Sequence, residues 1–155
     1  MNPNDRLLFL KYALPCGQTL VKRGELSQGK LDSLIQKVSC SLDVPDAERI
    51  FKVAYAHCSL LAKRAGKPID QKIIRQYFLE KHDEVIDKRF QEMRDFDPVQ
   101  CQVLRGEVLE AGEKAVVKTP SGTREFRTDF APDLERGDRV ILHWDFVVEK
   151  ANLSD

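Results

Sequence analysis

The spacing of apolar residues changes once along this 155-residue chain, and this change limits the possible folds more than any other feature. Over the first ninety residues, apolar positions recur at the spacing of one helix face. Over the last fifty, apolar and β-branched residues alternate or form short runs between glycines and prolines. The sequence therefore predicts an α+β protein with a helical domain over 1–92, a linker over 93–100 and a β domain over 101–155.

The helical domain is expected to be a small bundle of about four helices joined by short connections. Apolar residues over 7–12 indicate a first helix that ends at Pro15-Cys16-Gly17, because proline disfavours helix in the residue before it and glycine permits a turn. A second apolar stripe covers 31–38. A third helix is expected to begin at an Asp46 cap and to end at Gly66.

The fourth helix and the β domain complete the expected architecture. Asp70 can cap a helix that runs to about Phe90. Five strands are expected around residues 103–108, 115–117, 125–127, 140–142 and 146–148, with turn signals between them. Fifty residues are too few for a two-layer sandwich, whereas a barrel removes exposed strand edges. We therefore expect a closed or nearly closed five-stranded, OB-like barrel.

Charge and cysteine content exclude several classes of protein. Formal net charge is zero, with 8 basic and 11 acidic residues in 101–155 and 17 and 14 in the first hundred, so neither part has the basic field of a nucleic-acid binder. The four cysteines form no C-x-x-C pair, which argues against a disulfide framework or a closed zinc pattern. The apolar run over 7–10 is too short for a signal peptide or a membrane span, so the cytoplasm is expected.

The β domain resembles the HypC/HupF family of hydrogenase maturation chaperones. The family opens with a cysteine followed by three largely apolar residues, proline, glycine, a polar residue and valine. The β domain has a similar run, Cys101-Gln-Val-Leu-Arg-Gly-Glu-Val108, with Arg105 in place of the proline. The last block of the family typically reads Gly-Asp-Tyr-Val-Leu-Val-His-x-Gly-Phe-Ala-x-x-Lys. Here Asp145 stands where that glycine is usual, and the matching positions are Gly137, Asp138, Val140, His143, Phe146 and Lys150.

The resemblance implies a non-enzymatic chaperone that carries an iron centre bearing CO and cyanide to a hydrogenase large-subunit precursor. It assigns the metal to Cys101 and His143, and a HypD-like scaffold would supply the centre. A thiolate and an imidazole are suitable for this, because thiolates are soft iron ligands and imidazole ligates or exchanges protons near neutral pH. The predicted partner-binding residues surround these two: Arg105, Trp144, Asp145 and Phe146.

Other interpretations stay open at this stage. Cys101 is also typical of a small buried residue at a strand start, and His143 of a histidine inside a barrel. Cys16 lies at an expected turn and is a further metal or partner candidate, and a site assembled from Cys16, His57, Cys58 and His82 is a weaker possibility. We find no phosphate loop, H-E-x-x-H helix or G-x-S-x-G turn, so an enzyme is not expected.

Two alternatives to a metal carrier follow from the barrel itself. In the first alternative, the chain is a structural or regulatory interaction module that kept the barrel fold without the metal chemistry, since a shared fold does not by itself imply a shared function. A single-stranded nucleic-acid module would instead need an exposed aromatic and basic face. The residues available for such a face are Phe126, Arg127, Arg139 and Trp144.

Overall fold

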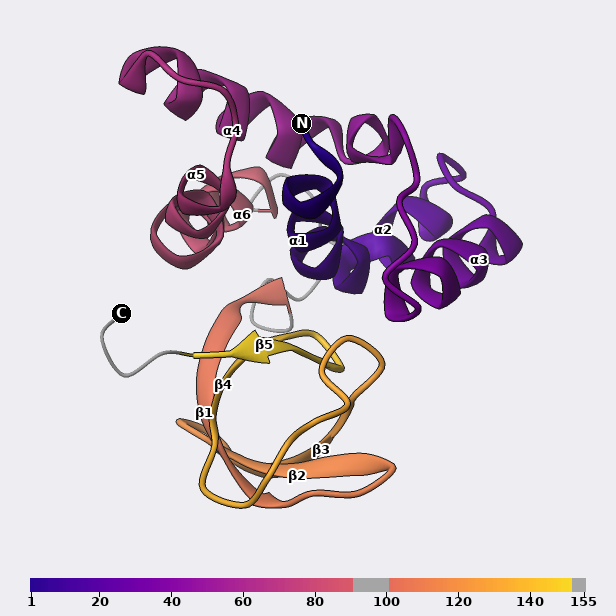
Figure 1. The fold of residues 1–155 in the computed structure, drawn as a ribbon, viewed down its shortest axis with the longest axis vertical. Coiled ribbons are helices and arrows are strands. Elements are labelled where there is room, and N and C mark those ends of the chain that lie inside the picture. The colour runs from indigo at the N-terminus through magenta and orange to yellow at the C-terminus, as the bar shows by residue number, and fades with distance from the viewer. Residues whose placement is uncertain (91–100, 152–155) are drawn as a thin grey trace. The chain divides into compact units, whose positions relative to one another are not determined.

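A computed structural model describes residues 1–90 and 101–151 of the chain, apart from the side chains of 89 and 90. The chain divides into two compact units, Met1–Gln102 and Val103–Asp155. The first is helical and the second carries the five-stranded sheet, which confirms the α+β class (Figure 1). All of the predicted linker, 93–100, lies outside the described residues. None of the helices in the described part of the chain has the length and apolar character needed to cross a membrane.

The first helix, α1 (Pro3–Ala13), does not end the helical path at Pro15-Cys16-Gly17 as predicted. Leu14–Cys16 continue as a 3-10 turn, and α2 (Gly17–Lys22) follows directly. Proline is tolerated there because Pro15 lies in the first turn of a new helical segment, where a backbone N–H has no intrahelical acceptor. The path from α1 into α2 therefore keeps Cys16 inside a continuous helical segment.

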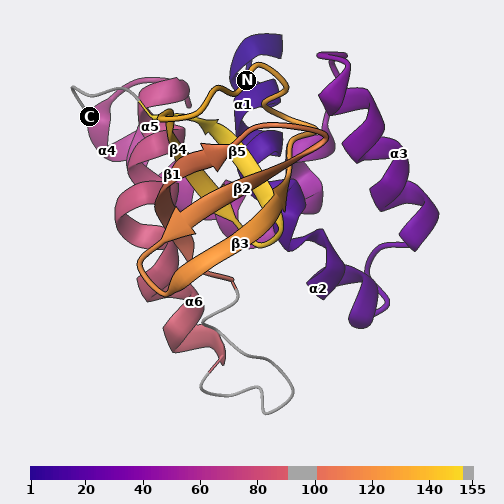
Figure 2. The same ribbon diagram turned by 90° about the horizontal axis from the view of Figure 1, so that it is seen from below.

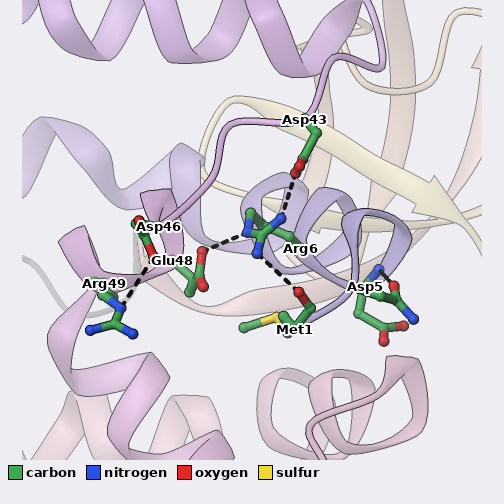
Figure 3. Close-up of polar contacts among 8 residues, drawn as sticks. Met1, Asp5, Arg6, Asp43, Asp46, Glu48 and Arg49 are labelled. Carbon is green, nitrogen blue, oxygen red and sulfur yellow. Dashed lines mark hydrogen bonds and ion pairs between the residues drawn. The ribbon is translucent and has the colours of Figure 1, made fainter.

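A partly buried ionic cluster around Arg6 links α1 to the segment before α4 (Figure 3). The guanidinium of Arg6 donates through Nε to Glu48 Oε2 at 2.8 Å, through Nη1 to Asp43 Oδ1 at 2.7 Å and through Nη2 to the Met1 carbonyl at 2.9 Å. Glu48 is nearly fully buried, at 5% side-chain exposure. A planar guanidinium satisfies these three acceptors at once, which a lysine ammonium on a flexible stem does less well.

The predicted second helix is confirmed, whereas the third begins later in the sequence than predicted. The predicted second helix is α3 (Gln28–Ser39). The predicted cap at Asp46 is wrong, because Asp46 has a left-handed backbone with φ of 65° and its side chain makes no capping bond. A 3-10 turn, η2 (Ala47–Ile50), comes first, and α4 (Lys52–Ala65) begins after it. The predicted end at Gly66 is confirmed, with φ of 67°.

The predicted fourth helix is present with an internal irregularity. It begins as α5 (Gln71–Gln76), whose first turn is capped by Asp70 Oδ1 accepting from the Ile73 N–H at 2.9 Å, as predicted. The π-helical segment η3 (Tyr77–Lys81) then leads into α6 (His82–Phe90). In Figures 1 and 2, α1 lies between α2 and α3 on one side and α4 to α6 on the other. An aromatic cluster joins α1 to η3, with Tyr12 stacked on Phe78 at 5.0 Å between ring centroids.

The second unit contains all five predicted strands, and they form a closed barrel. The strands are β1 (Val103–Glu110), β2 (Lys114–Thr119), β3 (Gly122–Arg127), β4 (Arg139–His143) and β5 (Phe146–Lys150). Their order is β1-β2-β3-β5-β4, and β4 also pairs with β1 (Figures 1 and 2). Alternation places one face inside. The interior cluster is Val108, Ala115, Val117, Phe126, Leu134, Val140, Leu142 and Val147.

Gly106 of β1 is closely packed against β2 and β4. A Cβ at this position would lie 2.6 Å from Val117 Cγ1 and 2.9 Å from Leu142 Cδ1. No real side chain fits at such distances without displacing its neighbours. The glycine that follows Arg105 in the opening motif therefore has a packing reason in this fold.

Candidate metal centre

Three potential metal ligands of the helical unit converge from separate segments of the chain. They are Cys16, His82 and Cys101, and their ligand atoms all lie within 4.8 Å of one another. His82 and Cys101 are buried, at 3% and 1% exposure, and Cys16 is half-buried. Two sulfurs and an imidazole nitrogen are a donor set that suits zinc, iron and other soft or borderline metals. These residues could hold a metal ion.

Cys16 owes its position to the junction between the 3-10 turn and α2. Its carbonyl accepts a hydrogen bond from Thr19 Oγ1 at 2.8 Å. Gly17 follows it, and a Cβ there would overlap the side chain of Leu31 on α3. The absence of a side chain at Gly17 thus lets this junction approach α3 closely, and this approach fixes the place of the Cys16 thiol.

His82 is the first residue of α6, directly after the π-helical segment. Such segments reorient side chains within a helix and are frequent at functional sites. The ring of His82 lies 5.5 Å from the Phe78 ring and 6.0 Å from the Tyr77 ring, measured between centroids. Its Nδ1 is 3.0 Å from Asp83 Oδ1. The carboxylate therefore fixes the orientation of the imidazole.

Opposing effects act on the pKa of His82, and the net result is a raised pKa. Burial lowers it, because desolvation disfavours the imidazolium. Hydrogen bonds from the ring to the Asp83 carboxylate and to Cys101 raise it more. His82 and Cys101 are thus in direct polar contact, and this contact separates Cys101 from an ordinary buried thiol.

Cys101 belongs to the helical unit by its contacts. The predicted domain boundary fell before Cys101, whereas the two compact units meet after Gln102. Cys101 therefore precedes β1, which begins at Val103, and lies outside the strand. Its exposure fits the alternative prediction of a small buried residue, but the potential ligands Cys16 and His82 also lie beside it.

His143, the second metal residue implied by the resemblance, ends β4 in the barrel unit. It is 1% exposed, and the sheet register pairs it with Val103 of β1 and Phe146 of β5. Val103 follows Cys101 by two residues in the sequence.

The four predicted partner-binding residues differ in exposure. Arg105 and Asp145 are exposed, and Trp144 is half-buried with a left-handed backbone at φ of 53°. The Trp144 carbonyl accepts from Arg124 Nη2 at 2.7 Å. Phe146 is 5% exposed and stacks on Phe130 at 4.9 Å between centroids, so its ring packs within the barrel unit.

From the sequence, Cys16 and Cys101 were predicted as separate candidates, and His82 was considered only as part of a weaker possible site. Of the weaker set Cys16, His57, Cys58 and His82, the described residues bring together only the first and the last. His57 stacks on Tyr77 at 5.5 Å, and Cys58 is buried in α4. Nothing in the spacing of Cys16, His82 and Cys101 indicates the cluster, because the tertiary fold of the helices assembles it.

We compared the chain with known protein families and with curated proteins. No family model matches this chain, and neither does any curated protein. The HypC/HupF resemblance therefore stays a prediction that rests on the residues of the barrel.

Proposed function

We propose that this chain is a HypC/HupF-like metallocentre-assembly chaperone that binds a HypD-like scaffold or a hydrogenase large-subunit precursor. One observation carries the proposal. Cys101, the residue that the resemblance assigns to iron, lies with two further potential ligands, the thiol of Cys16 and the imidazole of His82, within 4.8 Å. A thiol kept only for packing needs no such neighbours. The protein acts by binding and transfer and performs no catalysis.

In the carrier form of this function, an iron centre bearing CO and cyanide is the cargo, and Cys101 holds it through its thiolate. His143 assists by ligation or by proton exchange, as the resemblance implies. The register of β1 and β4 supports this pairing of roles, because Val103 lies opposite His143 and only Gln102 separates Val103 from Cys101. Soft thiolate donors suit low-spin iron with strong-field ligands.

The barrel supplies the surface that partners recognise. Its strand order, with β3 and β5 parallel, is compatible with the OB-like interpretation. The proposed docking residues are exposed Arg105 and Asp145 and half-buried Trp144, and the buried ring of Phe146 follows them in the sequence. We place this function in the cytoplasm, where thiols remain reduced.

The carrier function is tested by anaerobic co-purification from a hydrogenase-producing host. Wild type should retain infrared bands of metal-bound CO and cyanide, and Cys101→Ala should lose them. Cys40→Ala is the matched control, because Cys40 is an exposed cysteine outside the cluster. Absence of these bands from wild type, with partners still captured, would overturn the carrier role.

A second function, an interaction module without metal chemistry, is favoured by one observation. Cys101 is only 1% exposed, and a transfer ligand has to reach a partner. Such a module captures its partner equally well in wild type and in Cys101→Ala. The nucleic-acid alternative has less support, because the Phe126 ring is 1% exposed and Arg127 pairs with Asp129 at 2.9 Å.

A further inference from the structure

We propose that the helical unit has a metal site of its own, in which Cys16 Sγ, Cys101 Sγ and His82 Nε2 bind a soft or borderline divalent cation, with Asp83 as the positioning residue. This inference goes beyond the proposed function, because it needs no hydrogenase partner and no CO or cyanide. It gives the helical unit, whose role the barrel resemblance leaves open, a chemistry carried by its own residues.

The separations of the ligand atoms suit such an ion. Bonds of about 2.3 Å to sulfur and about 2.0 Å to nitrogen in a tetrahedral site place ligand atoms roughly 3.5–3.8 Å from one another. In the helical unit, the three ligand atoms all lie within 4.8 Å. The largest separation therefore exceeds that of a filled site by about 1 Å.

The tautomer of His82 is already directed toward metal binding. Asp83 Oδ1 lies 3.0 Å from Nδ1 and accepts its proton in a hydrogen bond, which makes Nε2 the ligand nitrogen. A carboxylate that orients a histidine in this way is typical of metal sites and raises the basicity of the ligand. The carboxylate of Asp83 is half-exposed and also contacts solvent.

Charge balance also favours a dication. Two thiolates carry two negative charges, and burying them together without a counter-ion is unfavourable. A divalent cation neutralises both, and His82 then ligates as the neutral imidazole. The cation and its three ligands are then electrically neutral together. Metal binding releases the protons of the two thiols and, where His82 was charged, its proton as well.

Cobalt is the probe, because Co²⁺ replaces zinc in tetrahedral sites and reports its ligands by absorption. The full chain, reduced and held anaerobically, is titrated with Co²⁺. We expect d–d bands of tetrahedral intensity and a thiolate-to-cobalt charge-transfer band. Cys16→Ser and Cys101→Ser should each lose about half of the charge-transfer intensity, and each of these and His82→Gln should weaken binding by at least about 100-fold.

Matched variants separate ligation from general damage. Cys40→Ser and His57→Gln change the same residue types outside the cluster and should bind Co²⁺ like wild type. Asp83→Asn should weaken binding by about 10- to 100-fold while leaving the spectrum tetrahedral, as expected for a residue that acts through His82. Circular dichroism confirms that each variant keeps its helices.

Three results would overturn the site. They are a wild type without a charge-transfer band, a Cys16→Ser variant with undiminished intensity, or a disulfide between Cys16 and Cys101 that persists under reductant. Failure of the carrier function does not affect this result, because the cobalt titration uses neither a partner nor an iron centre. Conversely, if the chain binds cobalt but shows no infrared bands of CO and cyanide, the helical unit binds a metal ion and the carrier function is wrong.

Discussion

Cys58 and Cys101 are equally withdrawn from solvent, at 0% and 1% exposure, yet their surroundings differ. Cys58 lies in α4, where burial raises the pKa of its thiol to about 12. Cys101 lies beside a second cysteine and contacts His82. Free cysteine is commonly buried as a small apolar residue, so burial alone says little about its role. The neighbours of the thiol decide whether it is a packing residue or a ligand.

The sharpest test of this comparison is thiol labelling at pH 8. A pKa of about 12 leaves Cys58 with roughly a thousandfold less thiolate than a thiol at the ordinary value of 9.0. Cys58 should therefore stay unmodified by iodoacetamide while exposed Cys40 reacts, as read by mass spectrometry of digested protein. Zinc should slow the labelling of Cys16 and Cys101 and leave Cys58 unchanged. Zinc protection of Cys58 would erase the distinction between the two thiols.

Metal-linked stability is expected to separate the same two cysteines. A cation that binds only the folded chain stabilises it by about 2.7 kcal/mol when present at 100 times its dissociation constant. Wild type and Cys58→Ala should both gain stability in zinc, measured by urea unfolding with and without the metal. Cys101→Ala should gain less than about 0.5 kcal/mol, because its zinc binding is expected to be at least about 100-fold weaker. An equal gain in all three proteins would mean that zinc binds elsewhere.

The position of Cys16 depends on Gly17, and a single methyl group tests this dependence. Gly17→Ala places a Cβ against Leu31, so we expect a loss of about 1–3 kcal/mol of unfolding free energy and weaker cobalt binding. Gly29→Ala in α3 is the control, because nothing lies within 4 Å of its Cβ position. This helical control should gain up to about 1 kcal/mol, since alanine is the better helix former. Both are measured by urea unfolding.

The barrel was the more predictable half of the molecule. Three of its pairings, β1 with β2, β2 with β3 and β4 with β5, join strands that are adjacent in sequence. Alternation and turn residues therefore carry enough information to locate all five strands. The parallel pairing of β3 with β5 follows from barrel closure and has no local sequence signal.

The helical unit followed its apolar stripes but not its expected boundaries. Asp70 and Asp46 are the same residue type before a predicted helix, yet only Asp70 accepts the capping hydrogen bond. Asp46 instead adopts a left-handed backbone and pairs with Arg49 at 3.5 Å. Pro15 likewise begins a segment where the sequence predicted an end. Tertiary contacts decide whether such a residue caps, begins or ends a helix, and these contacts cannot be read from a single sequence.

The metal cluster was the least predictable feature. Zinc motifs are recognisable in sequence when ligands lie a few residues apart on one turn or hairpin. Here Cys16, His82 and Cys101 come from the α2 junction, the start of α6 and the residue pair before β1. The tertiary fold, and not their spacing in the sequence, brings their ligand atoms within 4.8 Å of one another. The resemblance named Cys101, but it covers none of the helical unit.

The smallest expected effect concerns Asp70, which caps the helical path that carries His82. Asp70→Ala removes the bond to the Ile73 N–H and should cost about 1 kcal/mol of unfolding free energy at pH 7. Asp70→Asn keeps a capping oxygen and should cost less, because the lost ion pair with Lys67 is partly exposed and contributes little. Urea unfolding of the three proteins measures both differences.

The same pair of variants has a defined pH dependence. The hydrogen bond from Lys67 and that from the Ile73 N–H lower the pKa of Asp70 below 3.8. A lowered folded pKa adds stability that is present above the unfolded value, about 3.9, and is lost as pH falls through the folded value. The free energy of unfolding of wild type should therefore fall toward that of Asp70→Asn between pH 5 and pH 2.

Cobalt affinity at pH 7 should be unchanged in Asp70→Asn, because the cap stabilises the helix and the packing of His82 positions the ligand. A large loss of cobalt binding in this variant would show instead that the start of α5 controls where His82 lies.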